Sequence, residues 1–157
     1  MDFKDQPFIP MLFGGDINTY SVARAFYEEY QVKTYVFGKF PSGPSYNSNI
    51  IEYHANLKID TDEVFMQTVR DFAAAHADKT VLTIGCGDSY VALCSRHKDE
   101  MPENVIAPYI DFELMDRLQQ KELFYRLCRE HDIDFPDTLV FRHGMDLDFE
   151  LPFSFPV

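Results

Sequence analysis

Cysteine is scarce in this sequence, and the cysteines that occur have no regular spacing. Cys86, Cys94 and Cys128 are odd in number and form no CxxC motif. This pattern argues against both a disulfide framework and a zinc site. We expect the three cysteines to be reduced core residues, because each falls in an apolar segment.

Basic residues and long apolar runs are also scarce. The 14 Lys and Arg residues face 26 Asp and Glu residues, which gives a formal net charge of −12. Such a chain repels nucleic acid and anionic membrane surfaces, so neither is expected as a partner. No stretch approaches the roughly 20 apolar residues that span a bilayer. The acidic and polar N-terminus also lacks the basic start and apolar run of a signal peptide. The sequence therefore predicts a cytoplasmic protein.

The composition that remains is that of a folded domain. The 157 residues are 46% hydrophobic and 15% aromatic, which is enough to build the core of one ordinary domain. Apolar runs predict buried strands at residues 8–13, 33–39, 79–84 and 105–110, and a further extended segment at 50–59. Amphipathic spacing predicts helices at about 20–30, after a capping box of Asp60 and Glu63, at about 89–100 and at about 119–132. Residues 41–49 are predicted to be a loop.

Apolar strands that alternate with helices predict an α/β fold. We expect a Rossmann-like three-layer domain, in which helices flank both faces of a mainly parallel sheet. Ligands of such sheets bind at the carboxyl ends of the strands. Two glycine turns follow predicted strands, Gly14-Gly15 after the first and Gly85-Cys86-Gly87 after a later one. The two turns are therefore expected to lie at the binding edge of the sheet.

The glycine turns supply the candidate site. Backbone N–H groups and helix N-termini at these turns suit a carboxylate or a phosphate. The predicted substrate-binding residues are Gly14, Gly15, Asp16, Asn18, Gly85, Gly87, Asp88 and Ser89. The alternative is structural, with Asp16 or Asn18 capping one helix and Asp88 capping another. No catalytic residue or metal site is predicted, because the five histidines lack ligand spacing and a nucleophile partner.

Two parts of the sequence resemble a known enzyme family. Residues 121–138, KELFYRLCREHDIDFPDT, resemble the segment that leads from the first domain of ATP-grasp enzymes into their nucleotide-binding domains. That segment has a Lys, a short amphipathic helix, a Gly-Ile-Pro-like turn and a strand. Asp132-Ile133-Asp134 stands at the turn here. The stretches FIPMLFGGDINTYSVARAF, KFPSGPSYNSNII and GCGDSYVAL are similar to the D-aspartate ligase group of carboxylate–amine ligases.

The resemblance implies a full-length parent that is an ATP-dependent carboxylate–amine ligase. Such enzymes phosphorylate a carboxylate to an acylphosphate, which an amine then attacks. ATP and Mg²⁺ would be the cofactors, Lys121 would contact the ATP phosphates, and D-aspartate or another amino acid would be a substrate. Residues 1–118 would form the pre-ATP-grasp domain. Residues 119–157 would form the connecting helix and the start of a truncated nucleotide-binding domain.

The same resemblance implies that the 157-residue chain is inactive by itself. Residues 151–157 resemble the strand before a second nucleotide-binding Lys, and the magnesium ligands would follow Val157. The chain would hold no cofactor tightly, and its main partners would be the remaining ATP-grasp domains and the carboxylate and amine substrates. The sequence is compatible with a homo-oligomer but does not specify one.

Two other functions remain as hypotheses. One is a stand-alone Rossmann-like or flavodoxin-like module that binds a small ligand or a partner. The other is an oxidoreductase with a dinucleotide at the first glycine turn. Against it, Gly14-Gly15 lacks the full GxGxxG spacing, and Lys39 stands where an acidic residue is expected to end the second strand.

Overall fold

The computed structural model describes residues 2–41 and 43–146. The chain divides into two compact units, Met1–Met115 and Asp116–Val157, and each is described by itself. The functional boundary expected between residues 118 and 119 stays a prediction.

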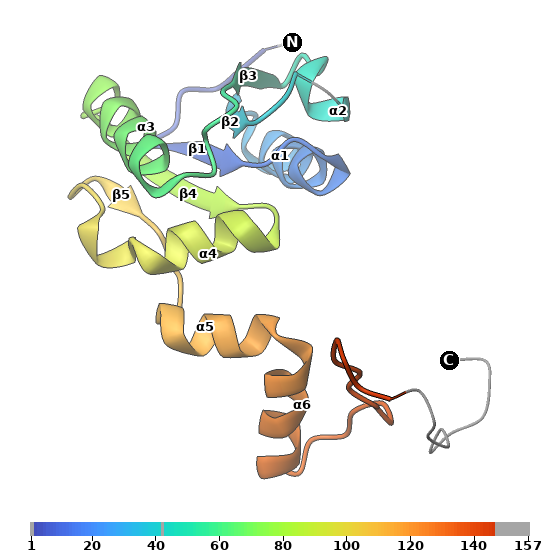
Figure 1. Cartoon of the computed structure of the whole chain (residues 1–157). Helices are drawn as coiled ribbons and strands as arrows, with labels where there is room; N and C mark the ends of the chain where they lie inside the picture. The colour runs from blue at the N-terminus through green and yellow to red at the C-terminus, as the bar shows by residue number, and fades with distance from the viewer. Residues whose placement is uncertain (1, 42, 147–157) are drawn as a thin grey trace. The chain divides into compact units, whose positions relative to one another are not determined.

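The first unit is built on a five-stranded parallel sheet (Figure 1). Its strands, in the spatial order β3-β2-β1-β4-β5, are β1 (Phe8–Phe13), β2 (Thr34–Gly38), β3 (Ile51–Ala55), β4 (Thr80–Gly85) and β5 (Val105–Ile106). The central strand β1 pairs with β2 on one side and with β4 on the other. The predicted Rossmann-like α/β fold is confirmed.

Helices cover both faces of this sheet. They are α1 (Ile17–Tyr30), α2 (Gly43–Tyr46), α3 (Asp62–Ala75) and α4 (Asp88–Arg96), with a 3₁₀ turn, η1, at Lys98–Glu100. The chain moves outward from β1 to β3 and then returns to β4 on the other side of β1. Because crossovers between parallel strands are right-handed, this reversal places α1 on one face and both α3 and α4 on the other.

The central strand has a core on each side. Successive strand residues point to opposite faces, so Met11 and Phe13 join one hydrophobic cluster with Phe65 of α3, while Leu12 joins a second cluster with Ala23 of α1. All five of these residues are fully buried. Burial on both faces explains why this strand is a continuous apolar run rather than an alternating one.

Two local predictions for the middle of the first unit were wrong. The N-cap of α3 is Thr61 and not Asp60, because the Asp60 carboxylate instead accepts a 2.7 Å hydrogen bond from Lys39 Nζ. The predicted loop at 41–49 contains the short helix α2. Its Ser45 is buried, and the Ser45 hydroxyl donates to the Asp16 carbonyl at 3.2 Å. A long-range contact therefore supports α2 in a segment rich in turn-forming residues.

Two segments are shorter than predicted, and one helix was not predicted. The extended segment at 50–59 contains only the five residues of β3, and the strand at 105–110 contains only the two of β5. Pro108 has no N–H to donate to a strand ladder, which accounts for the early end of β5. The helix α5 (Phe112–Gln119), which begins in the first unit and ends in the second, was not predicted.

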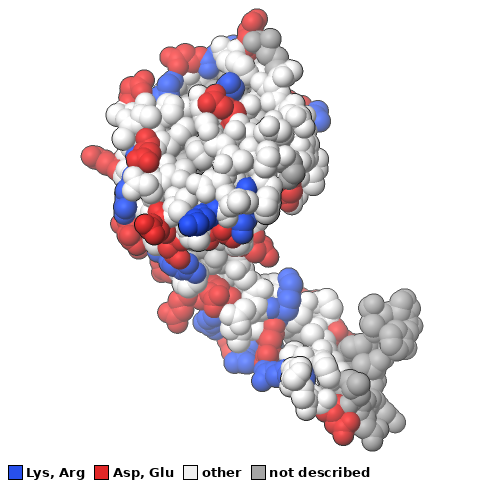
Figure 2. Space-filling view, turned by 45° about the horizontal axis from the view of Figure 1, so that its top comes forward, with Lys and Arg blue, Asp and Glu red and all other residues white. Residues whose placement is uncertain are grey.

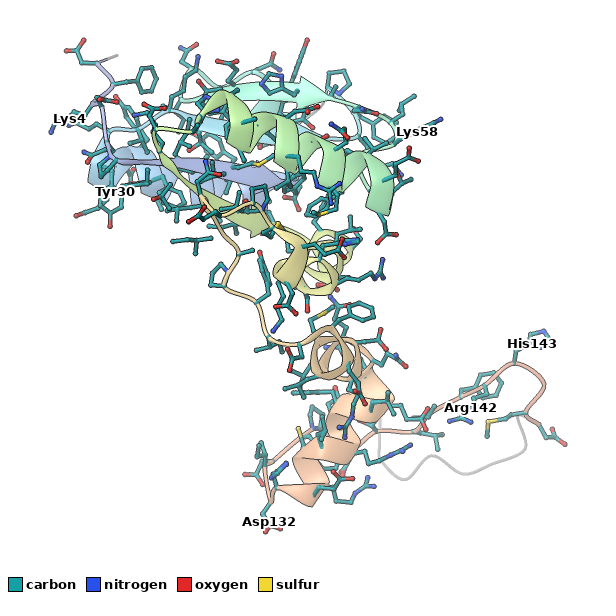
Figure 3. The ribbon with its side chains drawn as sticks, turned by 90° about the vertical axis from the view of Figure 1, so that its left-hand side faces the viewer. Lys4, Tyr30, Lys58, Asp132, Arg142 and His143 are labelled. Atoms are coloured by element: carbon teal, nitrogen blue, oxygen red, sulfur yellow. The ribbon has the colours of Figure 1, made fainter. Side chains whose placement is uncertain are left out.

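The second unit contains the predicted amphipathic helix, α6 (Lys121–Glu130). After α6, Asp132 has a φ of 53° and the Ile133 N–H donates to the Cys128 carbonyl at 2.8 Å, which is a Schellman turn (Figure 3). The strand that the resemblance implies after this turn is not formed in residues 133–140. A strand needs a neighbour for its backbone hydrogen bonds, and the described part of this unit contains no sheet. The predicted strand at 151–157 lies outside the described residues.

Candidate functional site

A pocket of about 480 Å³ lies at the carboxyl ends of β1, β2 and β4. The crossover from β1 runs toward β2 and the crossover from β4 runs toward β5, so the pocket occupies the point where the strand order reverses. Its lining consists of Gly14, Gly15, Asp16, Lys39, Phe40, Gly43, Tyr53, Cys86, Gly87, Ser89 and Tyr90. In Figure 3, Lys4 and Tyr30 mark the opposite end of the sheet from Lys58, which follows β3.

The fold brings most of the predicted substrate-binding residues together. Gly14, Gly15, Asp16, Gly87 and Ser89 line the pocket. Three predicted residues, Asn18, Gly85 and Asp88, are not part of the lining. Their inclusion followed from their position in the two turns alone, and whether any of the eight residues binds a ligand stays a prediction.

The three residues outside the lining have other places in the fold. The Asn18 amide donates to the Asp16 carboxylate at 3.0 Å. The Gly85 N–H donates to the Tyr109 hydroxyl at 2.7 Å. Asp88 is the first residue of α4, and the N-cap is Gly87, so the prediction of Asp88 as a cap was wrong. The extended backbone of Gly87 supplies the cap geometry without a side chain.

Asp16 caps α1, as one of the two alternatives predicted. Its Oδ1 accepts from both the backbone N–H and the hydroxyl of Thr19, each at 3.1 Å. Partial burial acts to raise the pKa of Asp16, but the hydrogen bonds from Thr19 and Asn18 outweigh it and hold the pKa below its usual value. The Asp16 carboxylate is therefore charged near neutral pH and is engaged with its own helix.

The first turn needs glycine at position 14. Gly14 has a φ of 150°, and a Cβ there would lie 2.2 Å from the Thr19 hydroxyl oxygen. The same residue donates its N–H to the Phe37 carbonyl of β2 at 3.0 Å. The backbone of Gly14 therefore lies close to β2 and to Thr19, and only glycine fits at this position of the pocket lining.

The second turn brings a helix N-terminus to the pocket. Gly87 precedes α4 and makes no side-chain capping bond, and both Gly87 and Ser89 line the pocket. A helix N-terminus carries a partial positive charge and N–H groups that suit an anion. The arrangement is compatible with a carboxylate ligand at this wall.

Sequence reasoning missed a third wall, which comes from β2, β3 and the segment after β2. The Tyr53 hydroxyl of β3 donates to the Phe40 carbonyl at 2.7 Å, so it ties this segment to the sheet. Lys39, Gly43 and Tyr90 also reach the pocket. The KFPSGPSYNSNII stretch carried the family resemblance, but it did not point to any side chain of this wall.

The hydroxyl and thiol groups of the pocket are neutral near pH 7. Burial raises the pKa of Tyr90 to about 12, and the nearby Asp60 and Tyr53 contribute to the increase. Burial likewise raises the pKa of Cys86 to about 11 and raises the pKa of Tyr53. Cys86 is therefore a thiol and a poor nucleophile at neutral pH. The three groups add no charge to the pocket, and the single Tyr53 proton is already donated to the Phe40 carbonyl.

The second unit contains the predicted ATP contact, Lys121. Lys121 is the first residue of α6, it is exposed, and its Nζ lies 5.8 Å from the centroid of the Phe124 ring. Among residues 2–41 and 43–146, no group of three or more His, Cys, Asp and Glu side chains could hold a metal ion. In the same residues, no helix is both long enough and apolar enough to cross a membrane.

The surface carries charges of both signs. Figure 2 shows Lys and Arg side chains scattered among Asp and Glu side chains over the visible face. Several of them form exposed ion pairs, such as Arg24 with Glu28 at 2.6 Å. Exposed pairs of this kind add little stability.

Comparison with known proteins finds a relative among the ligases. A D-aspartate ligase of Enterococcus faecium (strain Aus0004) is 39% identical to this chain over 161 residues. The chain is similar to D-aspartate ligase along almost its whole length. The resemblance predicted from the sequence is confirmed, and the alignment covers 98% of this chain. The chain spans 38% of the length of that D-aspartate ligase. No protein-family model and no solved structure matches the chain.

Proposed function

We propose that this chain is the substrate-side α/β domain of an ATP-dependent ligase that joins a carboxylate to an amine through an acylphosphate. The observation that carries the proposal is the 39% identity to D-aspartate ligase over 98% of the chain. D-aspartate is the first candidate for the substrate, because the name of that relative specifies it. A pocket at the switch point of the sheet supports the assignment, since this is where α/β domains bind small molecules.

The residues of the pocket would bind and orient the amino acid. Gly87 and Ser89 would direct the N-terminus of α4 at a carboxylate, whose negative charge interacts favourably with that end of a helix. Gly14 and Gly15 would let the ligand approach the backbone of the first turn. The neutral hydroxyl of Tyr90 would donate a hydrogen bond without adding charge. The Tyr53 hydroxyl, whose single proton goes to the Phe40 carbonyl, would accept one.

The nucleotide is proposed to bind mainly outside this chain. When bound, ATP supplies the phosphoryl group that activates the carboxylate. Lys121 fits one contact to a phosphate, because its ammonium is exposed at the start of α6. The described residues offer no cluster of acidic ligands for magnesium, so this ion is proposed to bind outside them. We propose that the 157-residue chain has no ligase activity by itself.

The test uses the whole polypeptide that the reading frame encodes. With ATP, Mg²⁺ and D-aspartate, it is expected to form ADP in a D-aspartate-dependent manner, and hydroxylamine is expected to trap the acylphosphate as a hydroxamate. Lys121→Met is expected to slow ADP formation by about tenfold or more, through loss of a charge at a phosphate. Lys33→Met is the control, because Lys33 pairs with Glu52 at 3.1 Å and lies outside the pocket lining.

A negative result would point to the other function predicted from the sequence. Without D-aspartate-dependent ADP formation and without hydroxamate, the ligase proposal fails. Small-ligand binding at the pocket that needs no ATP would then favour a stand-alone Rossmann-like binding module.

A further inference from the structure

The pocket lining contains two charged side chains among the described residues, Asp16 and Lys39. Both oxygens of Asp16 already accept hydrogen bonds, Oδ1 from Thr19 and Oδ2 from Asn18. These bonds hold the carboxylate against its own helix. Lys39 is therefore the charged side chain of the lining that has most capacity left for a ligand.

The backbone around Lys39 is fixed on both sides. The Gly38 carbonyl, which precedes Lys39, accepts from the Asn56 N–H at 2.9 Å. The Phe40 carbonyl, which follows it, accepts from the Tyr53 hydroxyl at 2.7 Å. The base of the Lys39 side chain is thus held by β3 and by the residue that follows it, and a ligand need not order it.

The ammonium group of Lys39 is held as well. Its Nζ lies 2.7 Å from Asp60 Oδ2, and the Lys39 side chain is 38% exposed. An ammonium has three N–H donors, so this ion pair leaves donors for a second acceptor. Lys39 is a lining residue and Asp60 is not.

We infer that Lys39 binds a carboxylate of the amino-acid substrate and thereby selects an acidic ligand. The inference rests on the proposed function, because it assigns the pocket to the amino acid, and it adds the residue that recognises the charge. The other polar side chains of the lining, Tyr53, Tyr90 and Ser89, carry no formal charge. Lys39 is thus the element of the lining that distinguishes an anionic from a neutral ligand.

The experiment is a titration of the ¹⁵N-labelled 157-residue chain with D-aspartate, followed by NMR at the backbone amides of Gly15, Gly87 and Ser89. Lys39→Met and Lys39→Gln remove the charge, and loss of a charge-assisted hydrogen bond is expected to weaken binding roughly ten- to hundredfold. Lys39→Arg keeps the charge and is expected to restore most of the affinity.

The chain offers a matched control at the other end of the same strand. The side chain of Lys33 is also 38% exposed and also pairs with a carboxylate, that of Glu52 at 3.1 Å, but it does not line the pocket. Lys33→Met is expected to bind D-aspartate as the unaltered chain does. Two neutral variants at position 39 are used so that a folding defect in one leaves the test intact.

The outcomes separate the inference from the function on which it rests. If D-aspartate shifts the three amides and both neutral variants bind as tightly as the unaltered chain, the role of Lys39 is overturned and the pocket assignment stands. If D-aspartate at millimolar concentrations shifts none of them, both fail. If inorganic phosphate shifts the same amides more strongly than D-aspartate does, and only with Lys39 present, the site binds phosphate and the carboxylate assignment is wrong.

Discussion

At the scale of single residues, Gly38 shows how closely the pocket wall is packed. A Cβ at this position would lie 2.0 Å from the Tyr53 hydroxyl oxygen and 2.3 Å from the Gly14 carbonyl oxygen. The tyrosine can rotate away, but the carbonyl belongs to the backbone that follows the central strand. The absence of a side chain at Gly38 therefore allows β2 to pass close to the first glycine turn.

Gly38→Ala is expected to lower the free energy of unfolding by about 2 kcal/mol or more, through overpacking against backbone. Urea denaturation measures the change. The matched control is Gly87→Ala, because the nearest atom to a Cβ there would be Tyr90 Cδ2, at 4.0 Å, so this variant is expected to lose only the smaller contribution of the α4 N-cap, about 1 kcal/mol. Equal stability of the two variants would contradict the steric argument.

Cys86 gives a second prediction at this scale. Burial raises the pKa of its thiol to about 11, and only the thiolate reacts with alkylating agents. Alkylation of Cys86 by iodoacetamide is expected to be slow at pH 8 and to increase as the pH rises toward 11. Mass spectrometry of digested protein measures the rate at each pH. A rate at pH 8 equal to that of an unfolded control peptide would show that the thiol is not buried.

At the scale of elements, α1 depends on the Asp16 cap. Asp16→Ala removes the acceptor for the Thr19 N–H and is expected to cost about 1 kcal/mol of stability at pH 7. The folded pKa of Asp16 is lowered, so its charge contributes stability above the unfolded pKa of about 3.9. That contribution is lost as the pH falls through the folded pKa.

The pH dependence can be measured against a variant that does not titrate. Urea denaturation at pH 7 and at pH 3 is expected to show a smaller stability difference between the unaltered chain and Asp16→Ala at the lower pH. Asp16→Asn keeps a capping oxygen without a carboxylate, so its capping contribution is expected to change less with pH. A constant difference across this range would contradict the role of the Asp16 charge.

The secondary-structure elements also show which local sequence patterns predict the structure correctly. The run at 8–13 gave β1 with its observed ends, because an apolar segment before Gly14-Gly15 has a clear exit. The capping box at Asp60 failed because Lys39, 21 residues away, binds the same carboxylate. A capping pattern considers only neighbours along the chain, and a stronger long-range partner overrides it.

At the scale of the whole molecule, the two units differ in what holds them together. Both hydrophobic clusters of the sheet lie in the first unit, between Ile9 and Tyr109. The second unit is built on α6 and the segments beside it, and Cys128 is a buried residue of that helix. The stability of the sheet is therefore expected to be independent of the second unit.

A chain that ends at Gln119 tests this expectation while keeping α5 whole. Its free energy of unfolding, measured by urea denaturation and circular dichroism, is expected to lie within about 1 kcal/mol of that of the full chain, because few interactions of the sheet core are removed. A much larger loss would show that the second unit contributes to the core of the first.

The sequence by itself determined the alternation of strands and helices, the two glycine turns and the similarity to a ligase. The alternation and the turns depend on the spacing of apolar residues and on backbone conformation, which act between near neighbours. The similarity to a ligase rests on the stretches that resemble that family. Only the tertiary structure decided which side chains share the pocket. Lys39, Tyr53 and Tyr90 come from separate parts of the chain. They meet because the strands pair in the order β3-β2-β1-β4-β5, and pairing between distant strands has no signature in the sequence around any one of them.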